Sequence, residues 1–199
     1  TSTMVGAREI EAFMQKVPDS VVVCFDEAYI ELLPAKKQPD TLKYVHEGRN
    51  VVIMRTFSKT YGLAGLRIGY VAAPESCIAL LNRVRQPFNV NAMAMEAAVA
   101  ALEDDGHVRK TCRMVKKGIA FFETEFRRMG LNFVPAVVNF ILVEVGRGRE
   151  VFEALQKEGV IVRPMDGYGL PAHVRVTVGT EEENRKCIEK LEKVISSRN

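Results

Sequence analysis

The sequence predicts an α/β fold with a mainly parallel sheet, followed by a smaller α/β domain. Two continuous apolar runs rich in β-branched residues, at 21–25 and 51–54, have the composition of parallel strands buried on both faces. Stretches with apolar residues at every third or fourth position lie on either side of them, as expected for helices that cover a sheet. Beyond residue 130, strand and helix patterns alternate, which indicates a second, smaller domain.

The first half of the chain has the patterns of three strands and four helices, one of them short. An apolar stripe over residues 10–17 predicts a helix that Pro18 ends, and the strand at 21–25 follows it. Residues 31–50 form a polar connection with a short helix near 42–45, before strands at 51–54 and 68–73. Pro74 suits the first turn of the next helix, and residues 90–102 predict an alanine- and methionine-rich helix that is mostly buried.

The second half begins with a long helix, expected over residues 108–129 and closed by Gly130 in a left-handed conformation. One or two strands within 133–145, a helix closed by Gly159, and strands at 160–162 and 174–178 should follow. Thr180 and Glu183 have the spacing of a capping box at the start of a final helix. We therefore expect three parts: a large domain at 1–105, a connecting helix at 106–130 and a small domain at 131–199.

Composition and charge exclude several classes of function. The chain has 199 residues and a net charge of +3, which is too small to indicate nucleic-acid binding. No apolar run approaches the ~20 residues of a membrane span, and no signal peptide is recognisable. The four cysteines form no CxxC pair and the three histidines lack metal-ligand spacing, so we expect neither disulfides nor a metal site. The expectation is a reduced, cytoplasmic protein in which most cysteines are buried.

A hydroxyl-rich loop between two predicted strands carries the residues that most strongly indicate chemistry. Residues 55–70 read RTFSKTYGLAGLRIGY, with a single lysine, Lys59, and an arginine, Arg67, after it. A phosphate-binding P-loop needs its glycines before the Lys-Ser/Thr pair, whereas here they follow Lys59, and their spacing does not fit a dinucleotide fingerprint. A solvated loop would explain either charged residue alone. The whole segment fits better a lysine that forms a Schiff base with pyridoxal phosphate (PLP), with hydroxyls and an arginine on the phosphate.

The segment from Ser58 to Tyr70 resembles the lysine signature of class I and II aminotransferases, and in particular that of the histidinol-phosphate aminotransferase family. The resemblance extends along almost the whole chain. It implies a PLP enzyme of fold type I that acts in histidine biosynthesis, in the cytoplasm, as a homodimer in its full-length form. The implied reaction is ping-pong transamination between histidinol phosphate and 2-oxoglutarate. The implied partners are small-molecule substrates, with no nucleic acid and no membrane.

The resemblance also implies roles for individual residues at the cofactor. Lys59 would bind the cofactor covalently and act as the catalytic base. Asp26, which follows the first predicted strand, would meet the ring nitrogen, and Tyr29 would meet the ring's phenolic oxygen. A turn-forming aspartate and a half-buried core tyrosine are the simpler alternatives for these two residues. The groups implied to hold the cofactor phosphate are Thr56, Ser58 and Arg67, although turn formation explains either hydroxyl alone equally well.

Three residues of the tail are implied to bind the substrate. Arg175 lies in a segment that resembles the family's carboxylate-binding strand, and Arg163 matches an arginine that helps to read a phosphorylated substrate. Asn139 is a weaker match to a residue near the charged end of the substrate. An exposed strand residue is the simpler explanation for either arginine.

The chain is shorter than members of this family. It begins where their central Asn-Pro-x-x-Pro-Thr-Gly segment should end, so we expect it to represent the C-terminal part of such an enzyme. The other half would supply an asparagine and a stacking aromatic residue at the ring, a glycine-rich phosphate loop and a tyrosine from the partner subunit. Two hypotheses stay open: an incomplete PLP aminotransferase, or a shortened relative that binds without turnover. Threonine-phosphate decarboxylases and aromatic aminotransferases share much of the signature.

Overall fold

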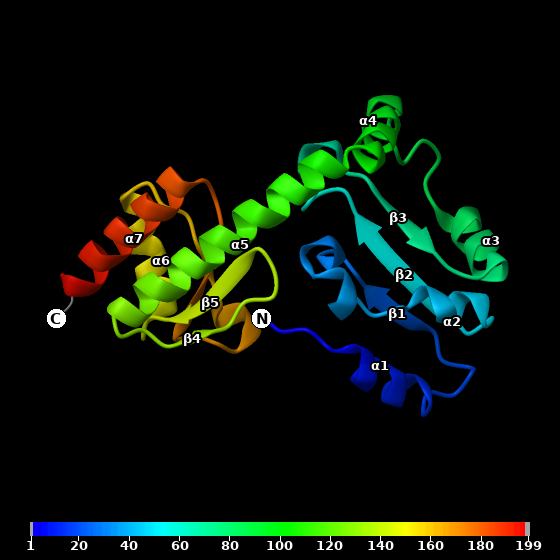
Figure 1. Ribbon diagram of the computed structural model, residues 1–199, viewed down its shortest axis with the longest axis horizontal. Helices are drawn as coiled ribbons and strands as arrows, with labels where there is room; N and C mark the ends of the chain where they lie inside the picture. The colour runs from blue at the N-terminus through cyan, green and yellow to red at the C-terminus, as the bar shows by residue number, and fades with distance from the viewer. Residues whose placement is uncertain (1, 198–199) are drawn as a thin grey trace. The chain divides into compact units, whose positions relative to one another are not determined.

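A three-stranded sheet in the order β1-β2-β3 organises the first half of the chain in the computed structural model, which describes residues 2–197 (Figure 1). β1 (Val23–Asp26) and β2 (Val51–Thr56) are parallel, and β3 (Gly69–Ala72) pairs with β2 in the antiparallel direction. All three side chains at the start of β2 are buried, as expected for a central strand. The expected α/β fold class is confirmed.

The described residues fall into two units. Val5–Thr111 forms the N-terminal unit, and residues 2–4 together with 112–197 form the C-terminal unit. The boundary lies inside α5 (Asp105–Arg128), the long helix that the apolar stripe predicts. The division into a large domain, a separate connecting helix and a small domain stays a prediction.

Helices and short 3₁₀ turns connect the strands of the N-terminal unit. α1 (Ala7–Met14) precedes β1, and α2 (Leu42–His46) lies between β1 and β2, after the 3₁₀ turns η1 (Ile30–Leu32) and η2 (Ala35–Lys37). η3 (Ala64–Leu66) belongs to the loop before β3, and α3 (Glu75–Val84) and α4 (Ala92–Glu103) come after it. The buried core of this unit consists of Ile10, Met14, Val23, Tyr44, Val51 and Ile53.

Two expectations about burial in this unit are wrong. β1 begins at Val23, whereas Val21 and Val22 are exposed, as is Cys24 inside the strand. Only alternate positions of β1 are therefore covered, in contrast to β2. α4 buries only small residues, and its larger apolar side chains are exposed: Met93, Met95, Val99 and Leu102. An apolar composition predicts the strand and the helix, but the neighbouring elements decide which faces are covered.

An antiparallel sheet in the order β4-β5-β7-β6 forms the C-terminal unit. Its central strands are β5 (Phe140–Glu144) and β7 (His173–Thr177), and its edges are β4 (Phe133–Val134) and β6 (Arg163–Pro164). The helices α6 (Gly148–Lys157) and α7 (Glu181–Ser196) and the second half of α5 share one core with this sheet. Its fully buried members include Phe122, Phe126, Ile141, Val143, Val151, Leu155, Val174 and Leu191.

Most turns of this unit follow the sequence signals, and one strand does not. Gly130 and Gly159 have φ of 69° and 76°, in the left-handed region that ends the preceding helices. Thr180 Oγ1 accepts a hydrogen bond from the Glu183 N–H at 3.3 Å, and the Glu183 carboxylate accepts one from the Thr180 N–H at 2.7 Å, so the capping box is present. The strand expected at 160–162 is wrong, because pairing with β7 begins only at Arg163.

The four cysteines are free and differ in exposure, so the expectation that most are buried is wrong. Cys24 is exposed, Cys77 and Cys112 are partly exposed, and Cys187 is buried. Burial raises the pKa of the Cys187 thiol to about 12. We expect iodoacetamide at neutral pH to modify Cys24 at least about tenfold faster than Cys187, because the thiolate is the reacting species. Mass spectrometry of the alkylated peptides measures both rates, and equal rates in the folded protein would contradict this difference.

Candidate active site

The lysine loop leaves the carboxyl end of β2, next to the carboxyl end of the parallel strand β1. β2 ends at Thr56, whose Oγ1 accepts a hydrogen bond from the Ser58 N–H at 3.1 Å. Phe57 between them is buried, and its ring lies 5.0 Å from the ring of Tyr61 and 5.7 Å from that of Tyr70. A hydroxyl turn and a buried aromatic anchor therefore fix the start of the loop.

The amine of Lys59 lies beside an aromatic ring of the same unit. Its Nζ is 5.6 Å from the centroid of the Tyr29 ring, within the range of a cation–π contact. Lys59 is exposed and forms no ion pair with any residue that the structure describes. Tyr29 is half-buried and stands between β1 and η1. The loop thus places the ammonium group of Lys59, which has no ion-pair partner among the described residues, next to Tyr29, which follows the neighbouring strand β1.

Asp26 is the last residue of β1 and pairs in register with Met54 of β2. Its Oδ1 accepts a hydrogen bond from the Ala28 N–H at 3.1 Å, and the side chain is exposed. Within residues 2–197 the carboxylate has no cationic partner. Because β1 and β2 are parallel and adjacent, Asp26 and the lysine loop emerge at the same edge of the sheet, where ligands of α/β proteins gather.

Arg67 lies at the other end of the lysine loop, where the chain comes back to the same edge of the sheet. The hairpin pairs Thr56 with Gly69, and the Phe57 N–H donates to the Ile68 carbonyl at 3.2 Å, so Arg67 comes level with the start of the loop. Arg67 has φ of 55° and ψ of 53°, a left-handed conformation that is costly for a residue other than glycine. Its Nη1 donates to the Ala64 carbonyl at 2.8 Å, and it pairs with no carboxylate in the described part of the chain.

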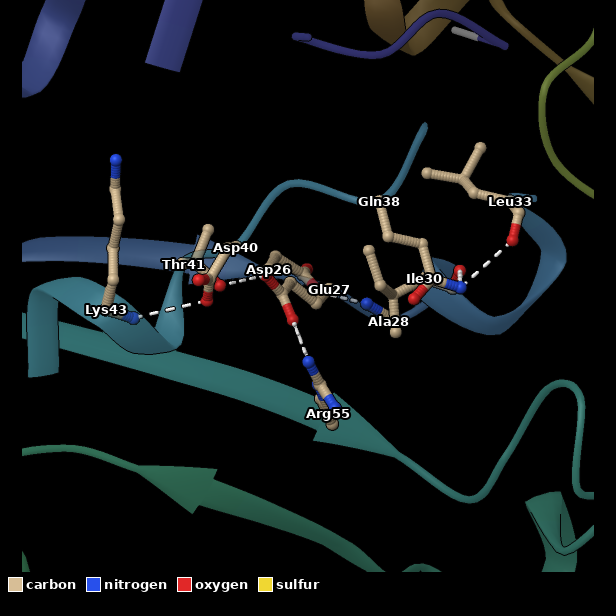
Figure 2. A network of polar contacts seen from close by, with 10 residues as sticks. All are labelled: Asp26, Glu27, Ala28, Ile30, Leu33, Gln38, Asp40, Thr41, Lys43 and Arg55. Carbon is tan, nitrogen blue, oxygen red and sulfur yellow. Dashed lines mark hydrogen bonds and ion pairs between the residues drawn. The ribbon is translucent and has the colours of Figure 1, made fainter. Parts of the chain in front are cut away.

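Glu27, which follows Asp26, and Arg55, which precedes Thr56, form a largely buried ion pair (Figure 2). The Arg55 Nε and Nη2 donate to Glu27 Oε2 at 2.9 and 2.8 Å, and the hydroxyl of the buried Thr41 donates to Glu27 Oε1. Burial tends to lower the pKa of Arg55, but hydrogen bonds with Tyr70 and Glu27 outweigh it, so the pKa is raised. This pair is absent from the residues predicted from the sequence, although its signal is present: opposite charges at the ends of two adjacent parallel strands.

Two of the three predicted substrate residues face each other across strands of the C-terminal unit. Arg163 of β6 is the register partner of Arg175 of β7. The Arg175 Cζ lies 4.5 Å from the centroid of the Phe140 ring, and its buried Nε has no hydrogen-bond partner. Neither arginine pairs with a carboxylate among the residues described. Like charges directly opposite each other are destabilising, so this pair suits an anion from outside the chain.

Asn139 lies apart from the two arginines along the sheet. Asn139 is the residue before β5, and its carbonyl accepts a hydrogen bond from the Val178 N–H at 2.9 Å. Arg175 pairs instead with Leu142, three residues further along β5, which is roughly 10 Å of strand. The predicted cofactor residues all belong to the N-terminal unit, and the three predicted substrate residues all belong to the C-terminal unit.

Acidic, cysteine and histidine side chains are scattered over both units. Among the described residues, no group of three or more of them is arranged to hold a metal ion. None of the helices within residues 2–197 has the length and apolar character that crossing a bilayer requires.

Comparison with known proteins gives a match over nearly the whole chain. The family model "Aminotransferase class I and II" matches residues 1–191. The histidinol-phosphate aminotransferase of Akkermansia muciniphila is 55% identical over 193 residues, which cover 97% of this chain and 53% of that protein. The chain therefore spans about half the length of this curated relative.

Two solved structures have a similar fold. The crystal structure of histidinol-phosphate aminotransferase from Sinorhizobium meliloti in complex with pyridoxal-5'-phosphate superposes with a TM-score of 0.92 at 25% identity, covering 100% of this chain and 55% of that one. L-threonine-O-3-phosphate decarboxylase from Porphyromonas gingivalis gives a TM-score of 0.80 at 25% identity, covering 98% and 61%.

Proposed function

Because the chain belongs to the family of class I and II aminotransferases, we propose that it carries the lysine and the phosphate-binding groups of a PLP-dependent aminotransferase. The proposed reaction is transfer of an amino group between histidinol phosphate and 2-oxoglutarate, and the name of the Akkermansia relative, histidinol-phosphate aminotransferase, supports the first of these substrates. One observation carries the proposal. Lys59, Asp26 and Arg67 emerge at one sheet edge, exposed and without ion pairs among the described residues.

These residues match the functional groups of PLP. The Lys59 amine suits the aldehyde, and the Asp26 carboxylate suits a protonated ring nitrogen. The Arg67 guanidinium and the hydroxyls of Thr56 and Ser58 suit the phosphate, which prefers a planar fork and short donors. When bound, PLP withdraws electrons from the substrate's α-carbon and so makes the proton on that carbon acidic.

Each residue then has a definite task in the proposed reaction. Lys59 would hold the aldehyde carbon of the cofactor, and its amine would move the proton that leaves the substrate's α-carbon. A positioned general base of this kind contributes roughly 10²–10⁴-fold to the rate. Asp26 keeps the ring nitrogen protonated through its negative charge. Tyr29 would donate a hydrogen bond to the ring's phenolic oxygen.

The proposed substrate is a phosphorylated amino compound because two arginines without carboxylate partners are register neighbours in the C-terminal unit. Arg163 and Arg175 can each present two parallel N–H donors to an anion. Arg175 would meet the charged group of the substrate and Arg163 would help to read its phosphate, with Asn139 near the charged end. We further propose that the full-length protein acts as a homodimer in the cytoplasm.

A substrate panel tests the reaction. The chain is incubated with PLP, 2-oxoglutarate and one of histidinol phosphate, phosphothreonine or phenylalanine, and glutamate and carbon dioxide are measured. We expect glutamate from histidinol phosphate, at least about tenfold faster than from phenylalanine, because only the former carries a phosphate for the arginines.

The other outcomes identify different functions. Release of carbon dioxide from phosphothreonine would indicate a decarboxylase, the second candidate, because the P. gingivalis enzyme shares the fold. Faster glutamate formation from phenylalanine would indicate an aromatic aminotransferase. Attachment of PLP at Lys59 without turnover of any substrate is the result expected both for a binding module and for an aminotransferase that needs the groups of its other half.

A further inference from the structure

We propose that Glu27 and Arg55 are positioning residues, whose ion pair fixes the lysine loop relative to Asp26. This inference rests on the proposed function, because the residues that the pair positions are those assigned to the cofactor. Neither residue is among those assigned to the cofactor or the substrate. Its role follows from its place in the chain, from how completely its hydrogen-bonding groups are used, and from its burial.

The pair joins two segments that each lead directly to a site residue. Glu27 follows Asp26, and Arg55 precedes Thr56, where the lysine loop begins. The Glu27 N–H also donates to the Met54 carbonyl at 2.9 Å, one residue beyond the paired register of β1 and β2. Backbone and side-chain bonds therefore hold the two strands together at the point where their chains diverge.

Both oxygens of the Glu27 carboxylate are occupied, so the side chain has a single orientation (Figure 2). Oε2 accepts from both Nε and Nη2 of Arg55, and Oε1 accepts from Thr41, which is 1% exposed. Two donors from one planar guanidinium restrict rotation of the Arg55 side chain as well. Movement of the loop start relative to β1 would have to break this arrangement.

Arg55 also connects the pair to the third strand. It is the register partner of Tyr70, and a Cβ placed on Gly69 would lie only 2.6 Å from the Arg55 carbonyl oxygen. β3 therefore approaches the backbone of Arg55 as closely as a glycine allows. In this way the side chain of Arg55 is fixed to the residue that follows β1, and its backbone is fixed to β3, which begins two residues after Arg67.

The burial of this pair sets it apart. The Glu27 side chain is 5% exposed, whereas the Glu123 and Glu125 carboxylates, which form ion pairs on α5, are 24% and 22% exposed. A buried ion pair often adds little stability over an apolar pair of similar volume, because both charges lose their hydration. What such a pair provides instead is one defined geometry between the two residues. Here it fixes the end of β1 relative to the end of β2.

A double variant removes the pair without leaving a buried charge. Glu27→Gln/Arg55→Met is compared with the unsubstituted chain and with Glu11→Gln/Lys43→Met, which removes a more exposed ion pair between α1 and α2 of the same unit. Hydrogen exchange of residues 57–66 is measured without cofactor. Separately, the rate at which PLP and borohydride label Lys59 is followed by peptide mass spectrometry.

We expect exchange in residues 57–66 to rise about tenfold in Glu27→Gln/Arg55→Met, because the start of the loop loses its attachment to β1. Labelling of Lys59 should slow about tenfold or more, because a displaced amine no longer meets a bound aldehyde. The control should change both rates by less than about twofold, because its ion pair is exposed to solvent.

The outcomes separate this inference from the proposed function. Unchanged exchange in the loop, or faster exchange with unchanged labelling of Lys59, would overturn the positioning role. If PLP does not label Lys59 in the unsubstituted chain, the proposed function fails. The exchange measurement then decides by itself whether the ion pair fixes the loop.

Discussion

Replacing Lys59 by alanine is expected to abolish the covalent attachment of PLP and to reduce any turnover by about 10⁴-fold or more, because the nucleophile and the general base are lost together. Lys59 is the only lysine in residues 55–70, so no neighbour within the loop can replace it. The absorbance of the bound cofactor and the formation of glutamate measure the two effects.

The matched control for this substitution is Lys37→Ala, which removes another exposed lysine of the N-terminal unit. Both variants should unfold at the same denaturant concentration as the unsubstituted chain, because Lys59 is exposed and has no ion pair among residues 2–197. Turnover by Lys59→Ala close to that of Lys37→Ala would contradict the assignment of the catalytic lysine.

Glu27→Ala is expected to destabilise the N-terminal unit by about 3 kcal/mol, because the substitution leaves the Arg55 guanidinium largely buried without its partner. The Thr41 hydroxyl loses its acceptor in the same variant. Urea unfolding followed by tyrosine fluorescence measures the loss. The chain has no tryptophan, and of its five tyrosines only Tyr168 lies outside the N-terminal unit.

Asp19→Ala is the control for Glu27→Ala, because Asp19 also pairs with an arginine of this unit, Arg49, at 3.1 Å. Its carboxylate is almost fully exposed, so its loss should not measurably change the unfolding midpoint. Equal midpoints for the two variants would show that burial of Glu27 does not strengthen its ion pair.

Much of the fold follows from local sequence patterns. The run at 51–54 predicts β2 because each of its residues is apolar and three are β-branched. Thr180 and Glu183 predict the start of α7 because their spacing alone satisfies the capping box. These signals depend on a few neighbouring residues, so a single sequence contains them.

The wrong expectations concern features that depend on distant parts of the chain. Cys24 lies in a β-branched run yet is exposed, because coverage of β1 depends on which elements pack beside it. The run at 160–162 has the composition of a strand, but the chain pairs with β7 only from Arg163 onward. Local composition contains neither piece of information.

The residue types of the candidate site could be chosen from the motif, whereas their spatial relations could not. Lys59, Asp26 and Arg67 keep their assigned roles as predictions, and the structure adds that they share one edge of the sheet. The pairing of Arg163 with Arg175 depends on strand register, and the Glu27–Arg55 pair joins residues 28 positions apart. Neither relation has a local signature.

Reduction of the PLP-treated chain with borohydride, followed by peptide mapping, tests the cofactor assignment most directly. We predict roughly one phosphopyridoxyl group per chain, on the peptide that contains Lys59, because this amine lies at the same sheet edge as the Asp26 carboxylate. Labelling spread evenly over the exposed lysines, or concentrated on one outside residues 55–70, would contradict the assignment.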